Sequence, residues 1–312
     1  MNIKQKNMFE TCSKNINHFI KYVKILTAEG YTNFRPYRFQ RNLLHKFAES
    51  WLNRYEMKKQ NHIVIAPRQC GKTTITAIYI LWYALFNSGK CIGLLTNKEG
   101  QAREILNKVK DIYDRLPDFL KVNIKKSVKN RIEFENGTYI FVSAYSRSSI
   151  CGKTVDLMVF DEMAFCDPQV LYDFLISVFP VQSAHVNTQT ILVSTPNGYN
   201  EFYKIYQHAV ESKSSFVATR IQYNEIPGHN VEWKNKIIHD FGQKFFDQEY
   251  DTRFIDSTNE ENSDDGKLIL KIDTSPLTRA ECKGLMKTLI KLFSKKLTLK
   301  ETDEDTYNIK FE

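Results

Sequence analysis

The chain has 312 residues, of which 42% are hydrophobic and 26% are charged. This composition can bury the cores of one or two domains and excludes an intrinsically disordered chain. The formal net charge of +8 favours a polyanionic partner, with nucleic acid the first candidate, although a generally basic surface would give the same charge. Residues 257–312 hold ten Lys and Arg against eleven Asp and Glu, so the basic excess lies in 1–256.

The cysteines and the most apolar segment bear on the compartment. The six cysteines are scattered without a CxxC pair, which disfavours a disulfide framework or a structural zinc site and suits a reducing cytoplasm. The N-terminus has no signal-peptide pattern. The most apolar stretch, 75–86, is shorter than the roughly 20 residues that a membrane-spanning helix needs. We therefore expect a buried helix there and no membrane partner.

Short apolar runs alternate along the chain with longer amphipathic segments. Strands buried on both faces are predicted at 63–66, 93–96, 157–160 and 190–195. Helices are predicted at 73–86, 98–116, 169–178, 200–212 and 232–252. The segments 131–135 and 138–144 flank Asn136-Gly137 and predict a hairpin at one sheet edge. The alternation predicts an α/β fold with a mostly parallel central sheet flanked by helices.

The composition changes at Asp256, which suggests a domain boundary. Residues 1–256 form the main α/β domain with a helical extension in this interpretation. Residues 257–266 (STNEENSDDG) are polar and acidic and are typical of a linker. Residues 267–312 would then be a small α/β tail of unknown role, with a strand at 268–272, a helix at 278–296 and a final hairpin.

Residues 66–74 (APRQCGKTT) lie between a predicted strand and a predicted helix, as a phosphate-binding loop does. In such a loop, backbone N–H groups and the helix N-terminus bind the β-phosphate of a nucleotide. Lys72 would reach the β- and γ-phosphate oxygens, and the Thr73 hydroxyl would bind Mg²⁺. The sequence departs from the GxxxxGK[ST] pattern at its first glycine, where Ala66 stands.

Arg68 lies inside this loop and has two interpretations. Its guanidinium could approach the transferring phosphate, as an arginine finger does. A solvent-facing charge is the alternative.

An acidic pair follows the predicted strand at 157–160. The strand would place Asp161 at its carboxyl end, where it can hold Mg²⁺ through water. Glu162 would then polarise a water toward the γ-phosphate. A turn or a helix cap is the alternative for this pair, but its occurrence together with the phosphate loop favours catalysis.

Two further segments complete the candidate site. Ser194 and Thr195 end the last predicted strand ahead of Pro-Asn-Gly, and their hydroxyls could sense the γ-phosphate and pass its state onward; ordinary turn chemistry is the alternative. Gln40 lies about 30 residues before the loop and could read the adenine edge with both amide groups. A helix start beside a core Phe39 would also explain Gln40.

Together these motifs resemble the ATPase domain of T4-like phage large terminases, the motors that pump DNA into a prohead. The resemblance rests on 68–74 (RQCGKTT), 159–165 (VFDEMAF) and 194–203 (STPNGYNEFY), and it covers about residues 35–256. It implies a P-loop NTPase fold for the main domain, with ATP and Mg²⁺ as cofactors.

The resemblance also implies roles for individual residues. The candidate ATP-binding residues are Gln40, Arg68, Gln69, Gly71, Lys72, Thr73 and Thr74. Arg68 would be the cis-acting arginine and Glu162 the catalytic base, Thr73 and Asp161 would hold Mg²⁺, and Ser194 and Thr195 would form the coupling motif. The family often has Arg-Gly before its acidic strand, where this chain has Cys151-Gly152. Arg147 is close enough in sequence to substitute.

The resemblance implies hydrolysis of ATP coupled to translocation of double-stranded DNA in the host cell cytoplasm. The expected partners are DNA bound through its backbone, the portal protein, the small terminase subunit and further copies in a ring on the portal. Large terminases normally continue into a nuclease domain, but only 56 residues follow Asp256, so no nuclease activity is expected from this chain. The alternatives are a helicase-like nucleic-acid remodelling ATPase and an inactive truncated terminase that acts in assembly.

A row of lysines marks the predicted tail helix, namely Lys283, Lys287, Lys291 and Lys295. A solvated face over a small core explains them, and contact with DNA phosphate is the alternative.

Overall fold

The computed structural model describes residues 2–56, 59–146, 154–183, 187–255, 269–273, 297–303 and 306–311. The chain divides into two compact units, 1–257 and 258–312. Most of the predicted linker at 257–266, the predicted tail helix with its lysines, Arg147 and Cys151-Gly152 lie outside the described residues.

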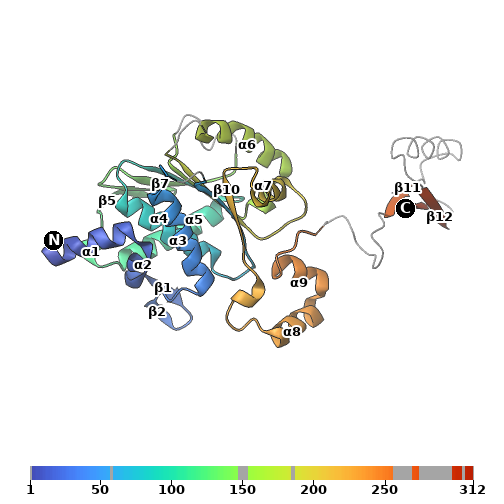
Figure 1. Cartoon of the computed structure of the whole chain (residues 1–312), viewed down its shortest axis with the longest axis horizontal. Coiled ribbons are helices and arrows are strands. Elements are labelled where there is room, and N and C mark those ends of the chain that lie inside the picture. Colours follow the sequence, from blue (N-terminus) through green and yellow to red (C-terminus); the bar gives the residue numbers. More distant parts are fainter. Residues whose placement is uncertain are drawn as a thin grey trace. The chain divides into compact units, whose positions relative to one another are not determined.

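The larger unit contains one central sheet (Figure 1). Among the described residues its strand order is β10-β3-β9-β8-β4-β7-β6-β5. The four predicted buried strands are confirmed as β3 (Asn61–Ile65), β4 (Cys91–Thr96), β8 (Leu157–Asp161) and β9 (Gln189–Ser194). Strand β9 lies between β3 and β8 and is parallel to both. The carboxyl ends of these three strands therefore meet at one edge of the sheet.

The predicted hairpin is confirmed at one side of this sheet. Its strands β6 (Arg131–Phe134) and β7 (Tyr139–Ala144) are antiparallel, and β7 is parallel to β4. The sequence analysis missed both outermost strands, β5 (Ile124–Val128) and β10 (Phe216–Arg220). Strand β10 is parallel to β3, whereas β5 is antiparallel to β6. The sheet is therefore mostly parallel, with an antiparallel end.

Helices cover both faces of the sheet (Figure 1). The helices α3 (Arg38–Leu52), α4 (Lys72–Phe86) and α5 (Glu99–Asp114) lie on one face, and α6 (Pro168–Ser183) and α7 (Glu201–Val210) lie on the other. Successive side chains of a strand point to opposite faces. Val64 accordingly packs with the cluster of the first face, and Ile63 and Ile65 pack with Phe202 of α7. The mixed α/β architecture that the sequence predicted is thus confirmed.

Helix α4 follows the phosphate loop and is buried almost throughout. From Ile75 to Leu85 every residue is buried, which confirms the buried helix predicted at this place. In the part of the chain that the structure describes, we find no helix with both the length and the apolar character that a membrane span requires. Four described cysteines, Cys12, Cys70, Cys91 and Cys166, are buried and free.

The N-terminal segment packs beside α3 and α4. It contains α1 (Ile3–Lys14), α2 (Ile16–Phe19), the 3-10 turn η1 (Ile20–Tyr22) and a hairpin of β1 (Lys24–Thr27) and β2 (Gly30–Asn33). Trp82 of α4 donates its indole N–H to the Cys12 carbonyl at 2.9 Å. The sequence analysis predicted none of these N-terminal elements.

Residues after β10 form two helices rather than the single helix predicted at 232–252, so that prediction was wrong. Helix α8 (Val231–Phe241) ends at Gly242, and α9 (Gln243–Glu249) begins after it. Gly242 has φ +86° and ψ 160°, a backbone conformation that no residue of a continuous helix adopts. Further 3-10 turns are η2 (Asp118–Leu120), η3 (Met163–Phe165) and η4 (Tyr223–Glu225).

The described part of the second unit is a small antiparallel sheet with the order β11-β13-β12. Its strands are β11 (Ile269–Asp273), β12 (Leu297–Asp303) and β13 (Thr306–Phe311). This confirms the predicted strand, shifted by one residue, and the predicted final hairpin.

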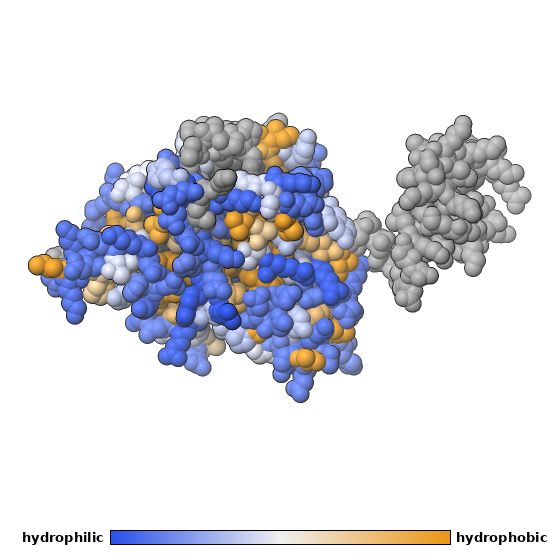
Figure 2. Space-filling view, viewed as in Figure 1, coloured by the Kyte–Doolittle hydropathy of each residue, from blue (hydrophilic) through white to orange (hydrophobic). Residues whose placement is uncertain are grey.

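The visible face of the main unit is largely hydrophilic, with apolar colour over α6 (Figure 2). Three large apolar side chains of α6 are exposed, namely Val170, Tyr172 and Ile176.

Candidate nucleotide-binding site

The loop that joins β3 to α4 has the geometry of a phosphate-binding loop. It passes from Ala66 to Gly71, which is the N-cap of α4 with φ +83°. A Cβ atom at Gly71 would lie 2.7 Å from the Gln40 amide nitrogen, so both the conformation and the space require glycine. Ala66 donates its N–H to the Ser194 carbonyl at 3.1 Å and so extends the pairing of β3 with β9. Because Ala66 still has strand geometry, the missing first glycine of the motif is not needed there.

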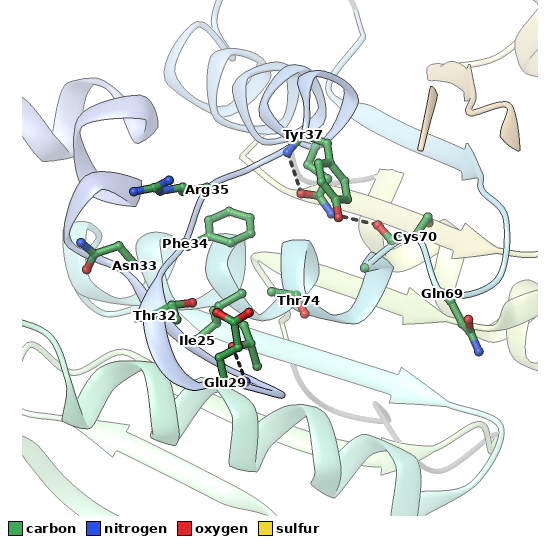
Figure 3. A pocket seen from close by; sticks show the side chains of 13 residues that line it. Ile25, Glu29, Thr32, Asn33, Phe34, Arg35, Tyr37, Gln69, Cys70 and Thr74 are labelled. Atoms are coloured by element: carbon green, nitrogen blue, oxygen red, sulfur yellow. Dashed lines mark hydrogen bonds between the residues drawn. The ribbon is translucent and has the colours of Figure 1, made fainter. Parts of the chain in front are cut away.

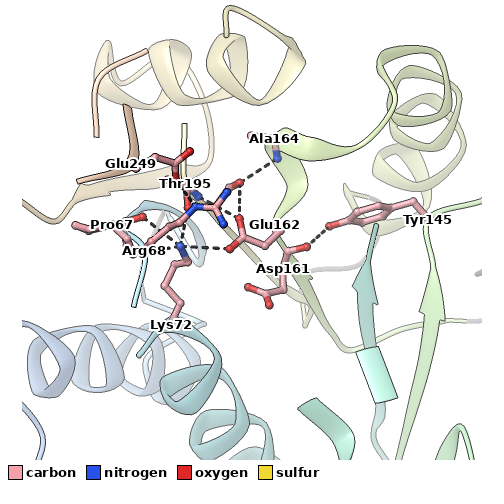
Figure 4. Close-up of polar contacts among 11 residues, drawn as sticks. Pro67, Arg68, Lys72, Tyr145, Asp161, Glu162, Ala164, Thr195 and Glu249 are labelled. Atoms are coloured by element: carbon pink, nitrogen blue, oxygen red, sulfur yellow. Dashed lines mark hydrogen bonds and ion pairs between the residues drawn. The ribbon is translucent and has the colours of Figure 1, made fainter. Parts of the chain in front are cut away.

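Lys72 connects the loop with the ends of the neighbouring strands (Figure 4). Its ammonium donates to the Thr195 hydroxyl at 2.8 Å and to the carbonyls of Ala66 and Pro67 at 3.3 and 3.2 Å. It also forms an ion pair with Glu162 at 3.3 Å. Only 8% of Lys72 is exposed. A buried ammonium with four oxygen neighbours marks a place prepared for further negative charge.

The acidic pair lies where the sequence predicted it. Asp161 is the last residue of β8, and Glu162 follows with φ +52°. A non-glycine residue in the left-handed region stores strain and is typical of functional sites. Burial, with a smaller contribution from the Glu162 charge, raises the pKa of Asp161 to about 7. The two carboxyl groups therefore have different environments, since 32% of the Glu162 side chain is exposed whereas Asp161 is buried.

The coupling residues contact both motifs. Ser194 and Thr195 are buried at the end of β9. The Ser194 hydroxyl accepts from the Ala164 N–H at 3.1 Å and donates to Glu162 at 3.4 Å. The Thr195 N–H donates to the same Glu162 carboxylate oxygen at 3.4 Å, and its hydroxyl accepts from Lys72. Strand β9 thus places one hydroxyl against the lysine and the other against the candidate base.

The loop after β9 is fixed to the turn that follows Glu162. The Asn197 and Asn200 side chains both donate to the Ala164 carbonyl, at 3.1 and 2.7 Å. Asn200 also accepts from the Tyr203 N–H and so caps α7. These asparagines belong to the TPNGYN segment, and the sequence analysis did not assign them a role.

Arg68 pairs with a residue that the sequence analysis missed. Its guanidinium hydrogen-bonds the carboxylate of Glu249, and its N–H donates to the Glu249 carbonyl at 3.0 Å. Glu249 is buried at the end of α9, while 55% of the Arg68 side chain is exposed. The hydrogen bond to Glu249 raises the pKa of Arg68, with further contributions from the charges of Glu249 and Glu162. Arg68 therefore lies close enough to the candidate base to feel its charge (Figure 4).

Gln40 lies on the other side of the loop (Figure 3). Its amide nitrogen donates to the Cys70 carbonyl at 2.9 Å, and its oxygen accepts from the Tyr37 N–H at 3.0 Å. Gln40 is 5% exposed and lies in the first turn of α3. In this structure its amide shapes the phosphate loop and caps α3. The proposed adenine contact stays a prediction, with one N–H of the amide left to make it.

The remaining loop residues have simpler surroundings. Gln69 has φ +58° and, like Thr74, faces a cavity beside Gln40. The Thr74 hydroxyl accepts from Lys108 at 3.2 Å. Thr73 follows Lys72 in the first turn of α4.

Magnesium fits the residues at this sheet edge. One carboxylate oxygen of Asp161 is buried without a hydrogen-bond partner among the described residues. Such an oxygen requires a cation or a water. Mg²⁺ commonly binds one or two carboxylates together with phosphate oxygens of the substrate. Asp161 and the Thr73 hydroxyl would hold it in this way.

Comparison with known proteins decides the family. Residues 63–271 match the family model of the T4likevirus-type terminase large subunit, N-terminal part. This match covers more than half of the 312 residues and includes the phosphate loop, the acidic pair and the coupling strand. The chain belongs to this terminase family.

Solved structures of terminases share the fold. The large terminase ATPase domain of Thermus phage P74-26 is 16% identical, with a TM-score of 0.57 over 71% of this chain and 95% of that one. The large terminase of bacteriophage HK97 is also 16% identical, with a TM-score of 0.61 over 87% of this chain and 58% of that one. That of a thermophilic bacteriophage is 15% identical, with a TM-score of 0.55 over 71% and 54%. The terminase chain thus spans little more than half the length of the two large terminases.

Proposed function

We propose that this terminase chain hydrolyses ATP and that hydrolysis drives translocation of double-stranded DNA into a prohead. The observation that carries the proposal is the group formed by Lys72, Glu162 and Thr195, which come from three different motifs and contact one another. A lysine, a carboxylate and a hydroxyl around one position are what a γ-phosphate and its attacking water require. The large terminase of the thermophilic bacteriophage binds ADP and ATP-γ-S, which supports the choice of nucleotide.

Each residue has a defined task in this mechanism. The loop N–H groups and Lys72 bind the phosphates and neutralise charge that develops in the transition state. Glu162 orients the attacking water and accepts its proton. Arg68 stabilises the transferring phosphoryl group once the nucleotide competes with Glu249 for its guanidinium. Mg²⁺, held by Asp161 and Thr73, would supply charge neutralisation between the β- and γ-phosphates.

The partners follow from the same proposal. DNA would be bound through its phosphate backbone, consistent with the net charge of +8, so binding would be independent of sequence and sensitive to salt. The motor would act in the host cell cytoplasm as a ring of identical chains on the portal protein, with the small terminase subunit as a further partner. We expect no nuclease activity from this chain.

The test compares ATP hydrolysis by the wild-type protein and Glu162→Gln, with and without long duplex DNA or proheads. We expect turnover that rises with DNA or proheads and falls by about 10²–10⁴-fold in the variant, the usual contribution of a general base. Glu104→Gln, the same change at an exposed position of α5, is the matched control. An absence of turnover under all conditions despite ATP binding would contradict the motor and leave an assembly factor. A strand-separation assay addresses the helicase alternative, because a packaging motor should not unwind duplexes.

A further inference from the structure

A cavity of about 610 Å³ lies beside the phosphate loop (Figure 3). Its size is typical of small-molecule sites, which usually measure about 300–1,000 Å³. One wall is the loop itself, from Gln69 to Gly71 with Thr74. The opposite wall is the β1–β2 hairpin, and Ile25 and the buried Phe34 add apolar surface. No role has yet been given to this hairpin in the site.

The position of the cavity relative to Lys72 suggests what it holds. The residues that line it do not include Lys72, Glu162 or Thr195, which surround the proposed γ-phosphate position. A nucleotide whose terminal phosphate lies at Lys72 extends along the loop N–H groups toward Thr74. Its base and sugar then leave the loop on the side of the cavity. The apolar surface suits a base, and the polar side chains of Glu29 and Asn33 at the hairpin suit ribose hydroxyls.

The hairpin needs support to serve as a wall. A two-stranded hairpin is marginally stable by itself in water. At its base, Val23 and Phe34 are buried, and the Phe34 N–H donates to the Val23 carbonyl at 2.8 Å. Its outer part has no such burial, since 63% of Leu26 and 46% of Tyr31 are exposed.

Tyr31 supplies this support through α5. Its hydroxyl donates to the Asp111 carboxylate at 2.9 Å. The Arg115 guanidinium lies 3.3 Å from the centre of the Tyr31 ring and pairs with the same Asp111 oxygen at 2.6 Å. One aromatic side chain thus joins the hairpin to a carboxylate and a cation that α5 already holds together.

We propose that the β1–β2 hairpin is the outer wall of the nucleoside pocket and that Tyr31, bound to Asp111 and Arg115, is a positioning residue that holds this wall in place for ATP. The proposal rests on the proposed function, because it names the part of the site that recognises the adenosine moiety. If the hairpin moves away from the cavity, ATP keeps its phosphate contacts and loses those of its base and sugar.

The test uses two ligands that share the phosphate loop. ATP needs both the loop and the nucleoside pocket, whereas inorganic tripolyphosphate needs only the loop. Dissociation constants of both are measured with Mg²⁺ for the wild-type protein, Tyr31→Ala, Tyr31→Phe and the matched control Tyr172→Ala on α6. Tyr31→Phe keeps the ring over Arg115 and loses only the hydroxyl.

We expect Tyr31→Ala to weaken ATP binding about five- to tenfold, since the apparent affinity falls with the fraction of protein that has the wall in place. Tripolyphosphate binding should stay within twofold of wild type. Tyr31→Phe should be intermediate for ATP, and Tyr172→Ala should match the wild type. In steady-state hydrolysis, KM should rise while kcat changes little.

Equal ATP affinity in Tyr31→Ala and wild type would overturn the inference, as would an equal loss for ATP and tripolyphosphate. In both cases the wild-type protein still binds ATP, so the proposed function stands. If the wild-type protein binds tripolyphosphate and no ATP, the proposed function itself fails.

Discussion

The hydroxyl of Thr195 offers a direct test of the link between the coupling strand and the phosphate loop. Thr195→Val removes the acceptor of the shortest hydrogen bond of Lys72, at 2.8 Å, and keeps the volume and the β-branch. The ammonium retains two carbonyls and Glu162, all at 3.2–3.3 Å. A hydrogen bond to a charged group contributes about 1.5–3 kcal/mol, and the remaining partners favour the lower value. A loss of about 1.5 kcal/mol in the transition state lowers the rate about tenfold.

The assay is single-turnover hydrolysis of ATP, together with the dissociation constant for ATP and the melting temperature. We expect the rate constant to fall about tenfold and ATP affinity to change by less than about threefold, because the loop N–H groups still bind the phosphates. Thr219→Val is the matched control: it is the same change at a buried hydroxyl of β10 that has no partner among the described residues, so it should be neutral or slightly stabilising. A hydrolysis rate within twofold of wild type in Thr195→Val would refute the reasoning.

Three further predictions concern stability and are measured by denaturant unfolding. Arg68→Ala and Glu249→Gln, combined in a double-mutant cycle, should give a coupling free energy of about 1 kcal/mol, kept small by the exposure of the arginine; zero coupling would contradict the ion pair. Asn200→Ala should cost about 1–2 kcal/mol through the lost cap of α7 and the lost hydrogen bond to Ala164, and an unchanged free energy would argue against both contacts. Burial lowers the pKa of His62 to about 3, so the unfolded chain binds a proton below about pH 6.5 that the folded protein refuses. The free energy of unfolding should therefore fall between about pH 6.5 and 3, by up to roughly 4 kcal/mol, and His62→Gln should reduce this dependence.

Local signals explain what the sequence predicted well. The phosphate loop, the acidic pair and the coupling strand are each a few residues long, and each follows an apolar β-branched run that marks a buried strand. The order of strands at one sheet edge then brings Lys72, Glu162 and Thr195 together, as expected. The two outermost strands carry a weaker signal: β5 reads IKKSV and exposes four of its five residues. Its stability comes from pairing with β6, which a pattern of burial does not reveal.

The missed site residues depend on contacts between distant parts of the chain. Glu249 lies 181 residues after Arg68, and its place at the loop follows from the break at Gly242, which the helical pattern of 232–252 conceals. A glycine within an amphipathic pattern does not by itself tell a helix end from a tolerated substitution. The β1–β2 hairpin was missed because its short strands KILT and GYTN are half exposed and depend on Tyr31 for support.

The course of the chain between Thr195 and Glu249 has a mechanical consequence. This segment leaves the site where Thr195 contacts Lys72, and it returns where Glu249 contacts Arg68, two basic residues of the same loop. Between these points it includes α7, β10, α8 and α9. Both ends of the segment are thus clamped to one loop, like a strap with two buckles on the same plate. Any nucleotide that draws the two basic side chains toward its phosphates pulls on both buckles together, and the helices between them are the part that must yield.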